Sequence, residues 1–334
     1  MHKFETFSPS ALQPFVSCLV KRGIPAERYL QRHHIPLKLI ASDSGKIFKR
    51  QAYGFFRDVA EREGLAGFGF LDGDPYSIDD LGSLGLATLQ AATFKEGLQI
   101  FSGRLASVAE GNHIWLEEGP ELSWIWCRTS GLERTDYVPD HTSILVLRAL
   151  LRLVAGPGWQ PPRVHFYTNP LEKIEKFLGI GESRAEFLQE ATGLAFPTEL
   201  LAKRMDRIRP QARIIESMED PPATTSAKLE AVLTSLYQSR YPVSIDLLAE
   251  MVGLSRVTLF RALAREETNY RQLVNRVGFK MAADLLENSP LSINEIGRQL
   301  NYSSTGNFIR AFQRMSGLTP AAYRERFLEL RGQN

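Results

Sequence analysis

The residues of this chain that are best suited to binding chemistry lie near its C-terminus. Residues 304–314, STGNFIRAFQR, place small polar side chains and arginines at helical spacing, and residues 255–261, SRVTLFR, repeat that arrangement. Arginine and asparagine side chains hydrogen-bond to base edges in the major groove of DNA, and arginine also binds phosphate. The two stretches therefore predict recognition of duplex DNA by Ser255, Arg256, Val257, Phe260, Arg261, Ser304, Thr305, Asn307, Ile309, Arg310 and Arg314.

Helical periodicity divides these positions by role. Leu259, Leu263, Phe308 and Phe312 fall on the inward faces and are expected in the core. Arg256 and Arg314 are predicted to contact phosphate, which would strengthen binding to all sequences alike. The outward positions that remain for reading bases are Val257, Phe260, Arg261, Thr305, Asn307, Ile309 and Arg310.

Two helices with a sharp turn between them would present the second stretch. A helix from Ser292 to about Leu300 begins with a capping box, formed by Ser292 and Glu295, and a turn at 301–303 follows it. Asn301 stands where this helix must stop in a left-handed conformation. The second helix runs from about Ser304 to Met315, which completes a helix-turn-helix, and its apolar stripe is Phe308, Ala311, Phe312 and Met315.

A second copy of this pattern lies upstream. Ser244 can cap a helix to about Met251, Gly253 makes the turn, and Ser255 caps a helix to about Glu266. Between the copies, residues 269–288 predict one helix. At ~1.5 Å rise per residue it spans ~30 Å, close to the ~34 Å turn of B-DNA. The two recognition helices are thus expected to enter successive major grooves on one face of a duplex.

This tandem arrangement resembles the AraC/XylS family of transcription regulators over residues 242–327. The departures from the family pattern are Gly297 in place of alanine, Asn301 in place of glycine and Gly278 in place of arginine. The resemblance implies a sequence-specific DNA-binding regulator rather than an enzyme, with RNA polymerase as a further candidate partner. The residues that carry it are Glu295-Ile296, Phe308-Ile309-Arg310-Ala311-Phe312, Gly317-Leu318-Thr319-Pro320, Tyr323-Arg324 and Leu285-Leu286.

The distribution of charge agrees with a DNA partner. Residues 221–334 contain fourteen Lys and Arg against ten Asp and Glu, a net charge of +4. The remaining residues contain 26 against 28, a net charge of −2. The whole chain of 334 residues is 43% hydrophobic and 23% charged, which is typical of folded domains and leaves room for two of them.

Composition also bears on the compartment. The two cysteines, Cys18 and Cys127, have no paired spacing, which suits a reducing environment. The N-terminus lacks the pattern of a signal peptide, and no run of eighteen apolar residues occurs. These observations predict a cytoplasmic protein without a membrane partner.

The first 220 residues predict a separate domain of mixed helices and strands. Two alternating stretches, 113–117 and 122–128, flank Glu118-Gly119-Pro120 and indicate a hairpin. A further strand is expected at 164–167 and another near Phe187. Residues 220–226 are polar and marked by proline, so the expected division is a domain at 1–220, a linker at 221–228 and a domain at 229–334. Helices are expected at 10–22, 25–34, 49–62, 93–109, 137–154, 171–178 and 205–218.

The order of these elements resembles the arabinose-binding-type N-terminal domain of one AraC subgroup. The residues that carry this resemblance are LGLATLQAATFKEGLQIFSGRL, the tryptophan hairpin, ILVLRALLRLV and PPRVHFYTNPLEKIEKFLG. It implies an α+β domain that senses a small-molecule effector and forms a homodimer, and not a cupin barrel. The C-terminal domain is expected to be all-α.

Two groups of side chains in the first domain are candidates for an effector site. Trp115, Trp124, Trp126 and Tyr137 could supply aromatic walls, and His141 and Arg148, on one stripe of a helix, could hold an anionic effector. Aromatic residues more often fill the core. Charged residues more often face solvent or another domain. A bound effector is expected beside the tryptophan hairpin and the helix that carries His141 and Arg148.

No pattern indicates a metal, a cofactor or a catalytic centre. His33 and His34 point ~100° apart on a helix without other ligands at metal spacing, and Lys46 lacks the upstream glycine of a phosphate loop. A DNA-repair methyltransferase would need an activated cysteine, but Cys18 and Cys127 lack the proline-cysteine-histidine setting of those enzymes. An architectural DNA-binding protein would not need the first domain.

Overall fold

The computed structural model divides the chain into two compact units, residues 1–221 and 222–334. It describes residues 4–42, 45–65, 78–171, 174, 184–205, 222–300 and 302–332. Three expected features lie wholly or largely outside these residues: the helix at 171–178, the helix at 205–218, and Asn301 in the turn.

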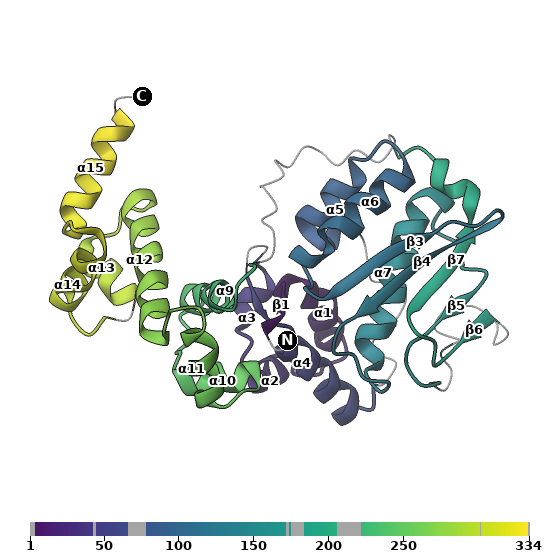
Figure 1. The fold of residues 1–334 in the computed structure, drawn as a ribbon, viewed down its shortest axis with the longest axis horizontal. Coiled ribbons are helices and arrows are strands. Elements are labelled where there is room, and N and C mark those ends of the chain that lie inside the picture. The colour runs from purple at the N-terminus through teal and green to yellow at the C-terminus, as the bar shows by residue number, and fades with distance from the viewer. Residues whose placement is uncertain are drawn as a thin grey trace. The chain divides into compact units, whose positions relative to one another are not determined.

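The first unit contains a five-stranded open sheet (Figure 1). Its strand order is β3-β4-β7-β5-β6, and only the β5–β6 pair is parallel. The predicted hairpin is confirmed as β3 and β4, and the sheet does not close into a barrel. β1 (Thr6–Phe7) and β2 (Ile47–Phe48) form a separate pair. The sheet strands are β3 (Asn112–Glu117), β4 (Leu122–Thr129), β5 (Val164–His165), β6 (Ala185–Glu186) and β7 (Thr192–Pro197).

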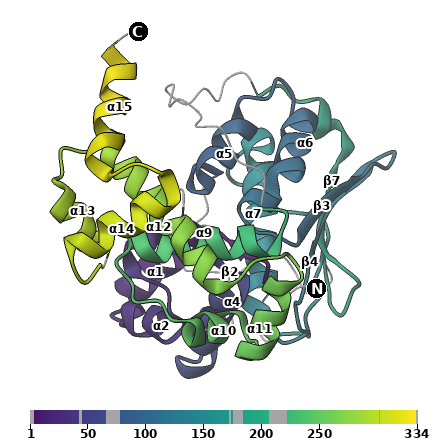
Figure 2. The same ribbon diagram turned by 60° about the vertical axis from the view of Figure 1, so that its left-hand side comes forward.

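Helices cover one face of this sheet, as the edge-on view in Figure 2 shows for α5, α6 and α7. The longest is α7 (Tyr137–Ala155), which packs along β7 and β4. The other helices of this unit are α1 (Gln13–Lys21), α2 (Ala26–Arg32), α3 (Leu37–Ile40), α4 (Lys49–Arg62), α5 (Gly82–Leu89) and α6 (Phe94–Arg104), with short 3-10 turns η2 (Pro9–Leu12), η4 (Ile78–Leu81), η5 (Leu105–Ser107) and η7 (Thr198–Ala202).

The side chains of β4 alternate between the two faces of the sheet, as predicted from period-two spacing. Ile125 and Cys127 are buried beneath α7, and Cys127 Sγ lies 3.7 Å from Ser143 Oγ of that helix. Trp124 and Trp126 point to the opposite face and are only half-buried. Part of the core of the first unit therefore lies between α7 and the sheet, and the same core continues among the other helices, for example at Phe15 and Phe55.

The second unit is all-α, as expected. Ser244 and Ser292 accept hydrogen bonds from the backbone N–H groups of Leu247 and Glu295 at 3.1 and 3.3 Å, so both predicted caps are confirmed. Gly253 has φ 74°, in the left-handed region that stops a helix. The helices are α9 (Thr225–Gln238), α10 (Ile245–Val252), α11 (Arg256–Ala264), α12 (Tyr270–Asn288), α13 (Ile293–Gln299), α14 (Thr305–Ser316) and α15 (Pro320–Gly332).

Two of these helices were not expected from the sequence. α9 begins at Thr225, inside the stretch expected to be a linker, and Thr224 caps it by accepting from the N–H of Ala227 at 3.2 Å. α15 follows the second helix-turn-helix and packs on α12 and α14. Each pair, α10 with α11 and α13 with α14, is therefore buttressed by further helices.

Candidate functional sites

The second recognition helix, α14, begins with a chain of hydrogen bonds that orients its outward side chains. The hydroxyl of Ser304 caps the helix by accepting from the N–H of Asn307 at 3.2 Å. The Asn307 amide donates to Ser303 Oγ at 2.7 Å, and Asn307 Oδ1 accepts from Arg310 Nη2 at 2.6 Å. Asn307 and Arg310 are both exposed. Arg310 is thus held at the outer surface of the first two turns.

Two other predicted base contacts of α14, Thr305 and Ile309, are only half-buried or bonded within the motif. The hydroxyl of Thr305 donates to Asn294 Oδ1 at 2.7 Å, and Ile309 is half-buried. The inward position expected for Met315 is wrong, because 43% of this residue is exposed. Arg314, expected at phosphate, is exposed.

The first recognition helix, α11, presents a more apolar outer surface. Ser255 caps it by accepting from the N–H of Thr258 at 3.2 Å. Val257 and Phe260 are 57% and 41% exposed, and Arg261 is exposed. Arg256 lies over the Phe260 ring and forms an ion pair with Asp246 of α10, with Nε 3.3 Å from Oδ1. This pair joins the two helices of the first motif.

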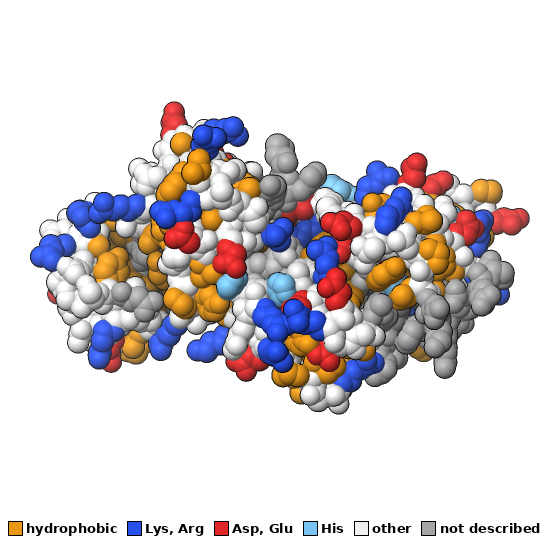
Figure 3. Space-filling model, turned by 90° about the horizontal axis from the view of Figure 1, so that it is seen from below, with side chains coloured by type: hydrophobic (Ala, Val, Ile, Leu, Met, Phe, Trp, Pro, Cys, Tyr) orange, Lys and Arg blue, Asp and Glu red, His pale blue; other side chains and the backbone are white. Residues whose placement is uncertain are grey.

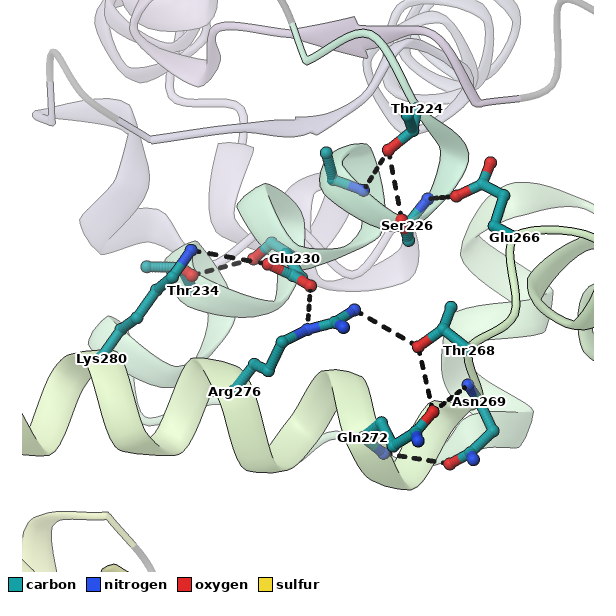
Figure 4. Close-up of polar contacts among 11 residues, drawn as sticks. Thr224, Ser226, Glu230, Thr234, Glu266, Thr268, Asn269, Gln272, Arg276 and Lys280 are labelled. Atoms are coloured by element: carbon teal, nitrogen blue, oxygen red, sulfur yellow. Dashed lines mark hydrogen bonds and ion pairs between the residues drawn. The ribbon is translucent and has the colours of Figure 1, made fainter. Parts of the chain in front are cut away.

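A polar network holds α9, α11 and α12 together (Figure 4). The carboxylate of Glu266, just beyond α11, accepts from the N–H groups of Thr225 and Ser226 at 2.8 Å each. Glu230 of α9 binds Arg276 of α12, with Oε1 2.6 Å from Nε. Sequence reasoning missed these positioning residues, because partners some forty residues apart leave no local signal.

The residues Tyr323 and Arg324, which carry part of the family resemblance, have a structural role. Arg324 donates to the carbonyl oxygens of Leu286 and Leu291 at 3.1 and 2.7 Å, and the Tyr323 hydroxyl donates to Glu287 at 2.8 Å. These bonds fasten α15 to the end of α12 and the turn that follows. The position of the second helix-turn-helix on α12 is fixed in this way.

The three predicted effector-site tryptophans form a stack on the face of the sheet away from α7. Trp124 and Trp126 lie with ring centroids 4.6 Å apart and planes 6° apart, and Trp115 stacks on Trp126 at 6.3 Å. Arg163 and Arg128 lie over the two ends of the stack, at 5.7 Å from Trp124 and 6.0 Å from Trp115. Cations and neighbouring rings therefore already occupy ring faces that a ligand would use.

The other three candidates lie on the opposite side of the sheet. His141 and Arg148 are buried, with 0% and 3% exposed, and the His141 ring packs edge-on against Phe166. Tyr137 is half-buried beside His141, at 5.8 Å between ring centroids. The sheet therefore separates the two groups, and the six side chains do not line one common site in the described structure. Solvent exposure, the alternative for His141 and Arg148, is wrong.

A mostly apolar cavity of about 80 Å³ does lie on the α7 side of the sheet. Phe15, Phe56, Phe101 and Val146 form part of its wall. Asn112 also lines it, and its buried Oδ1 has no hydrogen-bond partner among the described residues. No Lys, Arg, Asp, Glu or His is among the described residues that line this cavity, so it suits an uncharged ligand.

Burial of His141 has a measurable consequence for stability. Loss of hydration lowers its pKa from the ordinary value near 6.5 to about 3. Between these values the unfolded chain binds a proton that the folded chain does not, so the free energy of unfolding falls as pH decreases. The contribution is up to ~1.4 kcal/mol per pH unit.

His141→Gln should remove that contribution. All four tryptophans belong to the first unit, so tryptophan fluorescence during urea unfolding at pH 7 to 4 reports on it selectively. We expect the free energy of unfolding to fall less steeply with decreasing pH in His141→Gln, with a slope smaller by up to one proton. An identical pH dependence of the free energy of unfolding in the two proteins would mean that His141 is protonated in the folded state.

The described residues contain neither a cluster suited to a metal ion nor a helix suited to span a membrane. No group of three His, Cys, Asp or Glu side chains there is arranged to hold a metal ion. No helix there is both long and apolar enough to cross a membrane.

Comparison with known proteins gives two family matches. The model of the arabinose-binding domain of AraC transcription regulators, N-terminal, matches residues 23–205, more than half of the chain. A helix-turn-helix domain model matches residues 248–326. The two matches cover the unit that contains the sheet and the unit that contains the recognition helices.

Three individual proteins illustrate what this chain is similar to. The ornithine utilization regulator of Pseudomonas aeruginosa is 24% identical over 272 residues, which is 78% of this chain and 79% of that protein. The HTH-type transcriptional regulator VqsM of the same organism is 33% identical over 100 residues, or 30% of each chain. The crystal structure of the transcriptional regulator CdpR from Pseudomonas aeruginosa matches with a TM-score of 0.38 and 19% identity, over 90% of this chain and 96% of that one.

Proposed function

This chain belongs to the AraC family of transcription regulators, and we propose that it reads its operator with the exposed first turns of α11 and α14. The observation that carries the proposal is the hydrogen bond from Arg310 to Asn307, because it holds a guanidinium outward at the start of α14. A guanidinium held in this way is suited to the N7 and O6 atoms of guanine. On α11, Arg261 occupies the position that corresponds to Arg310, because each lies six residues after the serine that caps its helix.

The proposed contacts fall into two classes. Arg261, Asn307 and Arg310 contact base edges and give sequence specificity. Arg256 and Arg314 contact phosphates, which fixes the register of the protein on the duplex without reading sequence. Ser255 and Ser304 act through the helix caps that position these side chains.

Alanine substitutions test this division. Arg261→Ala and Arg310→Ala should each weaken binding to the operator by about 1–3 kcal/mol and leave binding to unrelated duplexes nearly unchanged. Arg256→Ala and Arg314→Ala should weaken binding to all duplexes. Each should also reduce the slope of the logarithm of the binding constant against the logarithm of the salt concentration, by the amount due to about one phosphate contact. Titrations at several salt concentrations separate the two classes.

Arg326→Ala on α15 is the matched control, since this arginine is exposed and lies on neither recognition helix. It should bind the operator as the unsubstituted chain does. Thermal unfolding must be similar for all variants, because each replaced side chain is exposed. Unchanged operator affinity in both Arg261→Ala and Arg310→Ala would refute the proposed reading surface.

The first unit supplies regulation in this proposal. It binds a small-molecule effector and pairs two copies of the chain, and the protein acts in the cytoplasm on double-stranded DNA and RNA polymerase without catalysing a reaction. The proposed effector site is the apolar cavity between α7 and the sheet. Its volume of about 80 Å³ is roughly half that of a cavity that holds benzene. An effector as large as benzene would therefore require the walls of this cavity to move apart.

A further inference from the structure

A groove lies beside the second recognition helix, between α12 and α14, and its volume is about 270 Å³. Gly278 of α12 lines it. A Cβ atom placed at Gly278 would meet only the Tyr302 hydroxyl oxygen, at 3.6 Å. The family resemblance places arginine at this position, and the absence of any side chain here keeps the groove open.

The groove has an apolar floor. Phe279 of α12 contributes to it, together with Phe308, Phe312 and Met315 of α14. Phe279 and Phe312 lie with ring centroids 5.0 Å apart. Met315 is 43% exposed and Phe279 is half-buried, so solvent reaches the apolar surface at both residues. On the face of the second unit drawn at the left of Figure 3, apolar side chains lie among basic ones.

The rim of the groove is polar and positively charged. Arg271 and Asn275 reach it from α12, Arg314 from α14, and Tyr302 from the turn. Neither arginine forms an ion pair or a hydrogen bond with any described residue, and no Asp or Glu is among the described residues that line the groove. Burial raises the pKa of the Tyr302 hydroxyl, whereas the nearby charge of Arg314 lowers it.

We propose that this groove binds a small amphipathic anion, whose apolar body lies on Phe279, Phe308 and Met315 and whose carboxylate binds Arg271 and Arg314. The volume approaches the lower end of the range for small-molecule pockets, roughly 300–1,000 Å³. A DNA phosphate would use the rim but would leave the apolar floor in water. A neutral apolar ligand would leave the two cations without a counter-charge.

This site goes beyond the proposed function, because it lies in the DNA-binding unit and not in the effector-sensing unit. It also couples to that function through Arg314, which is proposed to contact phosphate. An anion bound to Arg314 competes with the DNA backbone for the same guanidinium, so the ligand lowers the affinity of the chain for DNA. The site is therefore a second input to DNA binding.

The test uses 1-naphthoate as the probe, with neutral 1-naphthamide as the matched uncharged probe, in calorimetric titrations of the full chain. Naphthoate should bind at one site, at least about tenfold more tightly than naphthamide, since charge-assisted hydrogen bonds are worth about 1.5–3 kcal/mol, where 1.4 kcal/mol is tenfold. Arg271→Gln should remove most of that preference for the anion. Arg298→Gln, an exposed arginine of α13 outside the groove, is the control.

Substitutions at Gly278 locate the site. Gly278→Leu fills the groove and should weaken naphthoate binding at least about tenfold, whereas Gly278→Ala adds one methyl group in ordinary contact with Tyr302 and should change it less than about twofold. Alanine and leucine both favour a helix over glycine, so α12 is retained in both variants. Melting temperatures no lower than that of the unsubstituted chain verify this.

Three results would overturn the proposal. The first is the absence of saturable naphthoate binding. The second is equal binding by Gly278→Leu and the unsubstituted chain, which would place the ligand elsewhere. The third is no naphthoate binding together with a smaller salt dependence of DNA binding in Arg271→Gln, which would assign the groove to the DNA backbone. DNA binding by the unsubstituted chain is measured separately, so a groove that binds no anion does not refute the proposed function.

Discussion

The isolated segment 222–334 is expected to bind an operator with two half-sites about 10²–10⁴-fold more weakly than the full chain does. The reason is the proposed pairing of two chains through the first unit. Once one recognition unit is bound, the second meets its half-site at the effective concentration set by the dimer and not by the solution. The segment has its own cores, for example around Leu233 and around Phe308, and is therefore expected to fold alone.

Binding isotherms of the full chain and of the segment, each on duplexes with one and with two half-sites, measure this effect. On a single half-site the two proteins should differ little, and on two half-sites the difference should appear. If the segment binds at least as tightly as the effector-free full chain, pairing is not the main source of the full chain's affinity for the operator. It would show instead that the first unit blocks the recognition helices until an effector releases them.

The two helix-turn-helix motifs of the second unit could be predicted from sequence because their signals are local. Ser292 and Glu295 form the expected capping box, with the N–H of Ser292 donating to Glu295 at 2.8 Å. Ser255 and Gly253 begin and end helices where the sequence indicated. Each signal acts within one helical turn, so neighbouring residues determine the outcome. The Glu266 cap on α9 could not be predicted, because it joins residues that only the tertiary fold brings together.

The strand β7 shows why part of the first unit could not be predicted. Its six residues, Thr192–Pro197, contain a glycine and end in proline, and both weaken a strand signal. The structure requires that glycine. A Cβ atom at Gly193 would lie 2.4 Å from Cε3 of Trp126 on the neighbouring strand. The residue that hides the strand in the sequence is thus the one that lets the tryptophan ring lie across it.

The separation of the two groups of candidate effector residues could not be predicted for a related reason. Trp124 and Trp126 lie on one face of β4 and Ile125 and Cys127 on the other, as the period-two spacing of a strand requires. Spacing cannot tell which face a distant helix covers. α7 covers the face of Cys127, so His141 is buried on the side of the sheet opposite the tryptophans.

The central claim is that this chain recognises a specific DNA sequence with two recognition helices, and a competition experiment tests it most directly. An operator selected from a random duplex pool competes with an unrelated duplex of equal length for the full chain at one fixed salt concentration. Because specific complexes add base contacts to the shared phosphate contacts, the operator should bind at least about 10³-fold more tightly. A ratio near one, with both duplexes bound, would contradict the account and indicate an architectural DNA-binding protein.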